Sequence, residues 1–128
     1  MDTLSASFTI EVDGTPIAKV GFSAEDRAQA TTGPDAAVFT LKDGRLQSGD
    51  WVLARPMRED RSFAPKPVRW FKVSTEGDKL PVRPVTADED GDSYKIKFAN
   101  AGLMVDDDGN VLADLQGGIE SKVVVKTV

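Results

Sequence analysis

Hydrophobic and polar residues alternate with a period of two along much of this 128-residue chain. Residues 8–12 and 94–98 place an aromatic or aliphatic side chain at every second position, with polar side chains between them. This pattern is typical of a β-strand with one buried face and one wet face. Similar runs predict further strands over residues 38–42, 51–55 and 122–126.

Turn residues separate these runs at close intervals. Asp13-Gly14 and Asp43-Gly44 are pairs that favour the tight turn of a two-residue β-hairpin. Longer turns are predicted at residues 48–50 and 106–110, so consecutive strands are expected to fold back on each other.

One stretch departs from the alternation. Residues 23–30 begin with a possible serine cap, carry Asp26 at the capping-box position, and are followed by Gly33 and Pro34. The stretch predicts a helix of two turns or a loop. Because it has no large apolar side chain, we expect it to lie on the surface.

Counting the segments gives about ten to twelve short strands in a single all-β domain over residues 1–128. Such a pattern indicates a closed barrel or a sandwich. Aromatic triplets start at Phe8, Phe39 and Trp70, two equal steps of 31 residues, although the next triplet breaks the spacing. We therefore favour a β-trefoil-like barrel, with a Greek-key barrel or sandwich as the alternative.

The strand–turn–strand pattern of residues 39–46, 51–55 and 108–112 resembles that of small secreted or cell-surface fungal all-β proteins, several of which are trefoil-like. The resemblance covers about half of the chain and brings no catalytic motif. It implies a carbohydrate- or protein-binding module that is secreted or surface-exposed.

Composition excludes several functions. The chain has no cysteine and no histidine, so it lacks the nucleophile–histidine pair of many hydrolases and the usual ligands of zinc. A net charge of −5 opposes binding to nucleic acid, and no apolar run is long enough to insert into a membrane. The first residues lack the basic start and apolar core of a signal peptide, so a cytoplasmic location stays open beside a mature secreted chain.

Two acidic turns, residues 88–92 and 106–108, invite a calcium interpretation. Neither supplies the first and twelfth ligands of an EF-hand loop, so hairpin turns explain them better and no metal or cofactor is predicted. A weak calcium site of another type stays open at residues 106–108.

Paired carboxylates are the remaining acid–base chemistry. The alternative function is a small β-barrel enzyme, of isomerase, cyclase or glycosidase type, with Asp or Glu in a central pocket. Asp114 is the acidic residue that lies within an apolar strand, and an outward position on that strand is the expectation for it.

The most distinctive segment is the loop of residues 55–67, in which Pro56, Pro65 and Pro67 oppose a helix or a central strand. Restrained loops of this length are often functional. The predicted ligand-binding residues are the cationic Arg58, Arg61 and Lys66, the apolar Phe63, and Trp70 as a stacking platform. The favoured function is non-catalytic recognition of a glycan or a protein surface.

Overall fold

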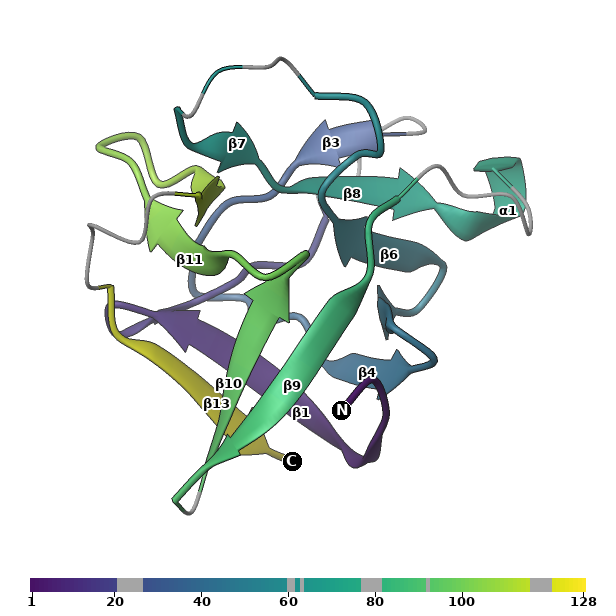
Figure 1. The fold of residues 1–128 in the computed structure, drawn as a ribbon, viewed down its shortest axis with the longest axis vertical. Coiled ribbons are helices and arrows are strands. Elements are labelled where there is room, and N and C mark those ends of the chain that lie inside the picture. The colour runs from purple at the N-terminus through teal and green to yellow at the C-terminus, as the bar shows by residue number, and fades with distance from the viewer. Residues whose placement is uncertain (21–26, 60–61, 63, 77–81, 92, 116–120) are drawn as a thin grey trace.

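The structure is a computed structural model that describes residues 1–20, 27–59, 62, 64–76, 82–91, 93–115 and 121–128. Its elements are short strands and one helical turn (Figure 1). In chain order they are β1 (Leu4–Val12), β2 (Thr15–Pro16), β3 (Arg27–Gln29), β4 (Phe39–Lys42), β5 (Arg45–Ser48), β6 (Trp51–Ala54), β7 (Lys66–Pro67), β8 (Arg69–Lys72), α1 (Val73–Glu76), β9 (Val85–Asp90), β10 (Ser93–Phe98), β11 (Gly102–Val105), β12 (Val111–Asp114) and β13 (Val123–Thr127). The predicted all-β fold is confirmed.

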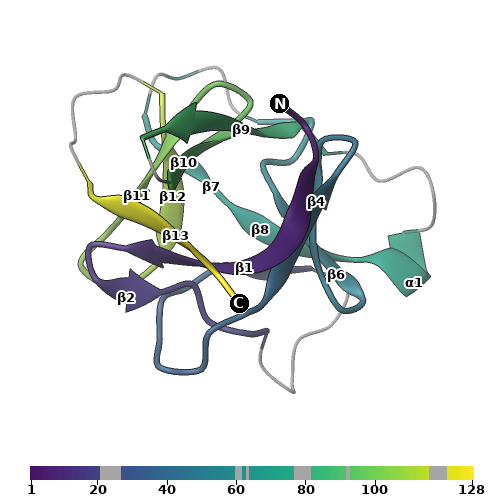
Figure 2. The same cartoon turned by 90° about the horizontal axis from the view of Figure 1, so that it is seen from below.

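The described strands form antiparallel sheets that do not close into one ring (Figure 2). The largest sheet runs β13-β1-β4-β5-β6-β8-β3, with β2 beside β1, while β9 pairs with β10 and β11-β12-β7 forms a further sheet. Single backbone contacts join the sheets, such as the bond from Val85 N to Gly44 O at 2.9 Å. Isolated bonds replace continuous pairing where the sheets meet, so the pairing of the described strands does not close them into a barrel.

The predicted hairpins are confirmed where Asp-Gly pairs mark them. At the turn between β4 and β5, Asp43 and Gly44 have φ angles of 53° and 79°, and Leu41 pairs with Leu46. Both turn residues need positive φ in this type of hairpin, which Asp tolerates and Gly adopts freely. The turn between β1 and β2 has the same form. The sequence therefore determines these turns locally.

Aromatic side chains from distant strands meet in the core. Phe39 stacks on Trp70 with ring centroids 5.7 Å apart and an interplanar angle of 6°, and Phe8 contacts Phe39 at 6.2 Å. Aliphatic residues of β1, β4, β5, β6 and β9 to β13 complete the buried cluster. The aromatic triplets that recur in the sequence therefore supply the centre of the core.

At one end of the core, three backbone segments form a ring of hydrogen bonds. Ala30 N donates to Val68 O at 3.0 Å, Val68 N to Val111 O at 3.2 Å, and Val111 N to Ala30 O at 2.8 Å. The side-chain nitrogen of Gln29 donates to the same three carbonyl oxygens at 2.9–3.1 Å. Segments widely separated in the chain are thus fastened at a single point.

Two local predictions need correction. Residues 27–29, expected to be helix or loop, form strand β3 and pair with β8, while residues 23–26 lie outside the described residues. The described helical turn is α1 instead, where the carboxylate of Asp50 accepts hydrogen bonds from the backbone and hydroxyl of Ser74. A cap supplied from more than 20 residues away in the sequence leaves no local signal.

Candidate functional site

The predicted binding loop begins at a buried ion pair. The Arg55 and Glu59 side chains are each 6% exposed, and they meet through two hydrogen bonds of 2.7 and 3.1 Å. The remaining Arg55 nitrogen donates to the carbonyl oxygens of Phe98 and Ala99 at 3.0 and 3.2 Å. Arg55 therefore ties the start of the loop to the turn after β10, and it does not form part of an open cationic surface.

Arg83 fastens the same segment from the other side. Its guanidinium lies 3.3 Å from Glu59 and donates to the carbonyl oxygens of Pro56 and Met57 at 3.2 and 3.0 Å. Its backbone nitrogen donates to Arg55 O at 2.9 Å. We call Arg55, Glu59 and Arg83 the loop clamp. The clamp fixes three consecutive carbonyl groups, so the backbone of residues 55–57 is held before any partner arrives.

The predicted site residues have different positions. Arg58 is exposed as expected, whereas Arg61 and Phe63 lie outside the described residues. Lys66 was expected to be an exposed cation, but it is 2% exposed, and its amine donates to Ser62 Oγ at 3.0 Å. That expectation is wrong because residues 66–67 form strand β7 and pair with β12 instead of continuing the loop.

Trp70 also differs from the prediction. It is 2% exposed and stacked on Phe39, so it offers no platform to a ligand. One face of strand β8 was expected to be open, but Phe71 on the opposite face is fully buried, with the Arg27 guanidinium 4.9 Å from its ring centroid. Trp51 is the more accessible tryptophan, with Lys72 Nζ 5.8 Å from its ring centroid.

Met57 was missed by the sequence analysis. Its side chain is 53% exposed, the highest value among the large apolar residues of the described part apart from the last residue, Val128. It stands beside the exposed Arg58 on the segment that the clamp holds. The signal for the clamp in the sequence was the spacing of Arg55 and Glu59, which are opposite charges four residues apart and form an ion pair.

The acidic turn at residues 106–110 is stabilised by hydrogen bonds to one of its own carboxylates, that of Asp106. Asp106 accepts hydrogen bonds from the backbone nitrogens of Asp108 and Asn110, both at 2.9 Å, and from the Asn110 side chain at 3.0 Å. The bond from the Asn110 backbone, followed by that from its side chain, lowers the pKa of Asp106 from its ordinary value of 3.8. Across the described ranges, no three acidic residues are grouped as metal ligands would be.

Among the described residues, few polar side chains are buried. The buried polar residues of the described part are Arg55, Lys66 and Asp114, and the hydrophobic cluster that fills the centre contains none of them. Asp114, expected to point outward, is 8% exposed, which corrects that expectation.

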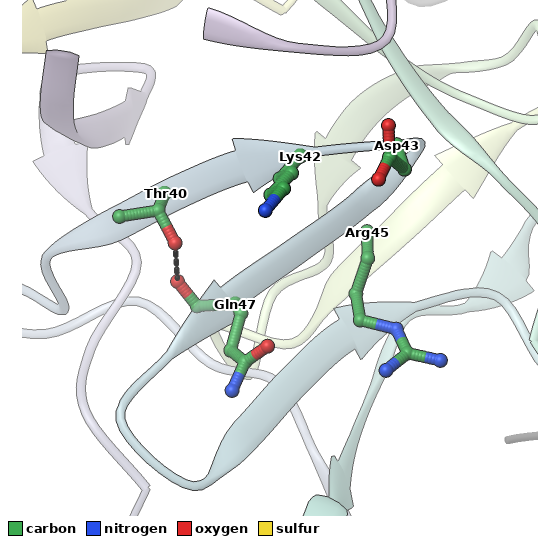
Figure 3. A pocket seen from close by; sticks show the side chains of 5 residues that line it. All are labelled: Thr40, Lys42, Asp43, Arg45 and Gln47. Carbon is green, nitrogen blue, oxygen red and sulfur yellow. Dashed lines mark hydrogen bonds between the residues drawn. The ribbon is translucent and has the colours of Figure 1, made fainter. Parts of the chain in front are cut away.

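A polar groove of about 450 Å³ lies on the outer face of the β4–β5 hairpin (Figure 3). Its lining comes from Thr40, Lys42, Asp43, Arg45 and Gln47. None of these residues was among the predicted site residues: Asp43 was assigned to turn chemistry, and the pattern of the hairpin did not single out the others.

Comparison with known proteins gives a fold and no family. Neither the scan against models of protein families nor the search of curated proteins finds a match. A solved structure, a salivary protein from Culex quinquefasciatus of the Cysteine and Tryptophan-Rich family, superposes with a TM-score of 0.60 at 14% identity, over 96% of this chain and 95% of that one. The two chains share a fold.

The likeness stops at the backbone. The salivary protein belongs to a family named for cysteine and tryptophan, whereas this chain has no cysteine and two tryptophans. The comparison gives no support to the fungal resemblance. No described helix is long and apolar enough to span a membrane.

Proposed function

We propose that this protein is a non-catalytic binding module that recognises a protein partner through the segment Met57–Arg58. The observation that carries the proposal is the exposure of Met57 and Arg58 on a backbone that the loop clamp holds rigid. Methionine and arginine are enriched in protein–protein interfaces. Arg61 and Phe63 extend the proposed contact along the same loop.

Preorganisation explains why this segment is favoured over other exposed surface. A loop that is already ordered loses less conformational entropy on binding, so more of the contact energy appears as affinity. The clamp supplies that order through ion pairs in which Arg55 and Glu59 are buried and Arg83 is partly exposed, and these pairs stay formed when a partner covers Met57.

The shared fold with a salivary protein supports secretion or surface exposure as the location proposed for this chain.

We also propose a trefoil-like arrangement of three units: β1–β4, then β5 to β9, then β10–β13. The ring of Ala30, Val68 and Val111 takes one residue from each unit, which supports this arrangement. Superposition of the three units by a threefold rotation in an experimental structure tests it.

A photo-crosslinking amino acid at position 57 tests the function directly. Incubated with secreted proteins of the source organism, the labelled protein is expected to crosslink to a discrete partner. The same label at Val38, an apolar residue 43% exposed on a different segment, serves as the control. Equal crosslinking from both positions, or none from position 57, contradicts the proposal.

Affinity for the crosslinked partner gives the second measurement. Met57→Ala with Arg58→Ala is expected to weaken binding about tenfold or more, as truncation of central interface residues does. Val38→Ala with Lys95→Ala leaves binding unchanged, because these residues lie outside the loop. The melting temperature of both variants stays close to that of the parent, since the changed side chains are exposed.

A further inference from the structure

A second surface carries charges that the fold does not use. In the β4–β5 hairpin, Lys42 is the direct cross-strand partner of Arg45, next to the pairs Leu41–Leu46 and Thr40–Gln47. Alternation places Leu41 and Leu46 in the core and leaves the other two pairs on the outer face, where they line the groove of Figure 3.

Two like charges directly opposite each other in an antiparallel pair are unfavourable. Within the described part of the chain, neither Lys42 nor Arg45 makes an ion pair or a side-chain hydrogen bond. Arg45 is partly exposed, and no described residue serves as an acceptor for its guanidinium. The hairpin thus carries two cations at directly opposite positions, and neither is held by an ion pair within the described part of the chain.

The rest of the groove is polar. Gln47 donates from its side-chain nitrogen to Gly49 O at 2.9 Å, which leaves its side-chain oxygen as an acceptor facing the groove region. Thr40 contributes a hydroxyl whose bond to Gln47 O is long, at 3.5 Å. Asp43 at the turn offsets one of the two cations, so a single positive charge remains in excess.

We infer that this groove binds a saccharide carrying an anionic group, with the sulfate or carboxylate held between Lys42 and Arg45. A guanidinium pairs with such a group through two parallel hydrogen bonds, and the Lys42 amine adds a third donor. Thr40 and Gln47 meet the sugar hydroxyls. A groove of about 450 Å³ falls in the range of ligand pockets and exceeds what one simple oxyanion fills.

The observations favour a short acidic saccharide over nucleic acid. A polyphosphate chain requires an extended basic surface, whereas this groove has one excess positive charge on a protein of net charge −5. The site lies on a different hairpin from Met57–Arg58, and it does not depend on the function proposed for that segment.

The test is a titration of isotope-labelled protein followed by NMR. The probes are a sulfated disaccharide, an unsulfated disaccharide containing a uronic acid, a neutral disaccharide and a short single-stranded oligonucleotide. We expect one of the two acidic disaccharides to shift the amide signals of residues 40–47, with a dissociation constant of about 1 mM or tighter. The stronger of the two identifies the anionic group.

Two double variants separate the site from general attraction of charge. Lys42→Gln with Arg45→Gln is expected to weaken binding about tenfold or more, whereas Lys19→Gln with Lys122→Gln, the same change of charge on exposed lysines elsewhere, leaves it within about twofold. Four results overturn the inference: no shift with either acidic disaccharide, equal binding of the neutral one, equal loss in both variants, or tighter binding of the oligonucleotide.

Discussion

Arg55 and Arg45 carry the same side chain in opposite surroundings. Arg55 is buried, with four hydrogen bonds to Glu59 and to two carbonyl oxygens. Arg45 lies on the outer face of a hairpin, opposite a lysine, and none of the described residues serves as its acceptor. Charge therefore occurs in two settings in this protein: in the loop clamp it is paired and holds a loop, whereas on the β4–β5 hairpin it is unpaired within the described residues and, as we propose, available to a ligand.

The largest effect is expected where the paired charges are broken. Glu59→Gln leaves Arg55 and Arg83 together without a counter-charge, and removing one partner of a buried ion pair typically costs about 3–5 kcal/mol. Urea unfolding measures the loss of stability. Arg45→Gln is the matched variant from the open hairpin, and its stability stays within about 0.5 kcal/mol of the parent. A similar cost for both variants contradicts the distinction between the two regions.

Gln29→Ala is expected to have the next largest effect. The change removes the amide that donates an additional hydrogen bond to the carbonyl oxygens of Ala30, Val68 and Val111, each of which keeps its backbone donor. The net loss is about 0.5–1.5 kcal/mol per hydrogen bond removed. Gln47→Ala removes one bond at an exposed turn and is the control. Equal melting temperatures for the two variants show that the ring of backbone bonds holds without Gln29.

Gln29 and the loop clamp mark the limit of what the sequence predicts. Asp43-Gly44 and the alternation in β4 and β10 encode their hairpins locally, because turn geometry and burial of one face depend on neighbouring residues. Gln29 and Arg55 act on segments about 40 or more residues away. Only the assembled fold brings those partners together, so no local pattern announces them.

The errors at the candidate site have a similar origin. Alternation assigns Trp70 and Phe71 to opposite faces of β8, but it does not say whether each face is covered. Both are buried. Lys66 was assigned to a loop because of its flanking prolines, yet it pairs with Ala113 across a short strand. Exposure of Arg58 was predictable, whereas the exposure of Met57 depends on a clamp formed with Arg83.

Asp106 sharpens the comparison because it is a charge stabilised by its own turn. Its folded pKa is lowered, so its contribution to stability is fully present above the unfolded value of 3.8 and is lost as pH falls through the lower folded pKa. The difference in melting temperature between the parent and Asp106→Ala is therefore constant near neutral pH and shrinks below about pH 4. A difference that persists unchanged in strong acid contradicts a role for the carboxylate charge.

The smallest expected effect is a gain of stability at the open hairpin. Lys42→Glu converts a like-charge cross-strand pair with Arg45 into an opposite-charge pair, which is worth a few tenths of a kcal/mol to about 1 kcal/mol. The gain is measured by thermal unfolding at low salt, and it diminishes at high salt because exposed charges are screened. The same change abolishes binding of the acidic disaccharide, since it puts a carboxylate where the anionic group is held. Higher stability together with lost binding is the result expected if these charges serve a ligand.

If Lys42→Glu destabilises the protein at low salt, Lys42 makes a favourable contact, and the hairpin does not differ from the loop clamp in carrying unpaired charge.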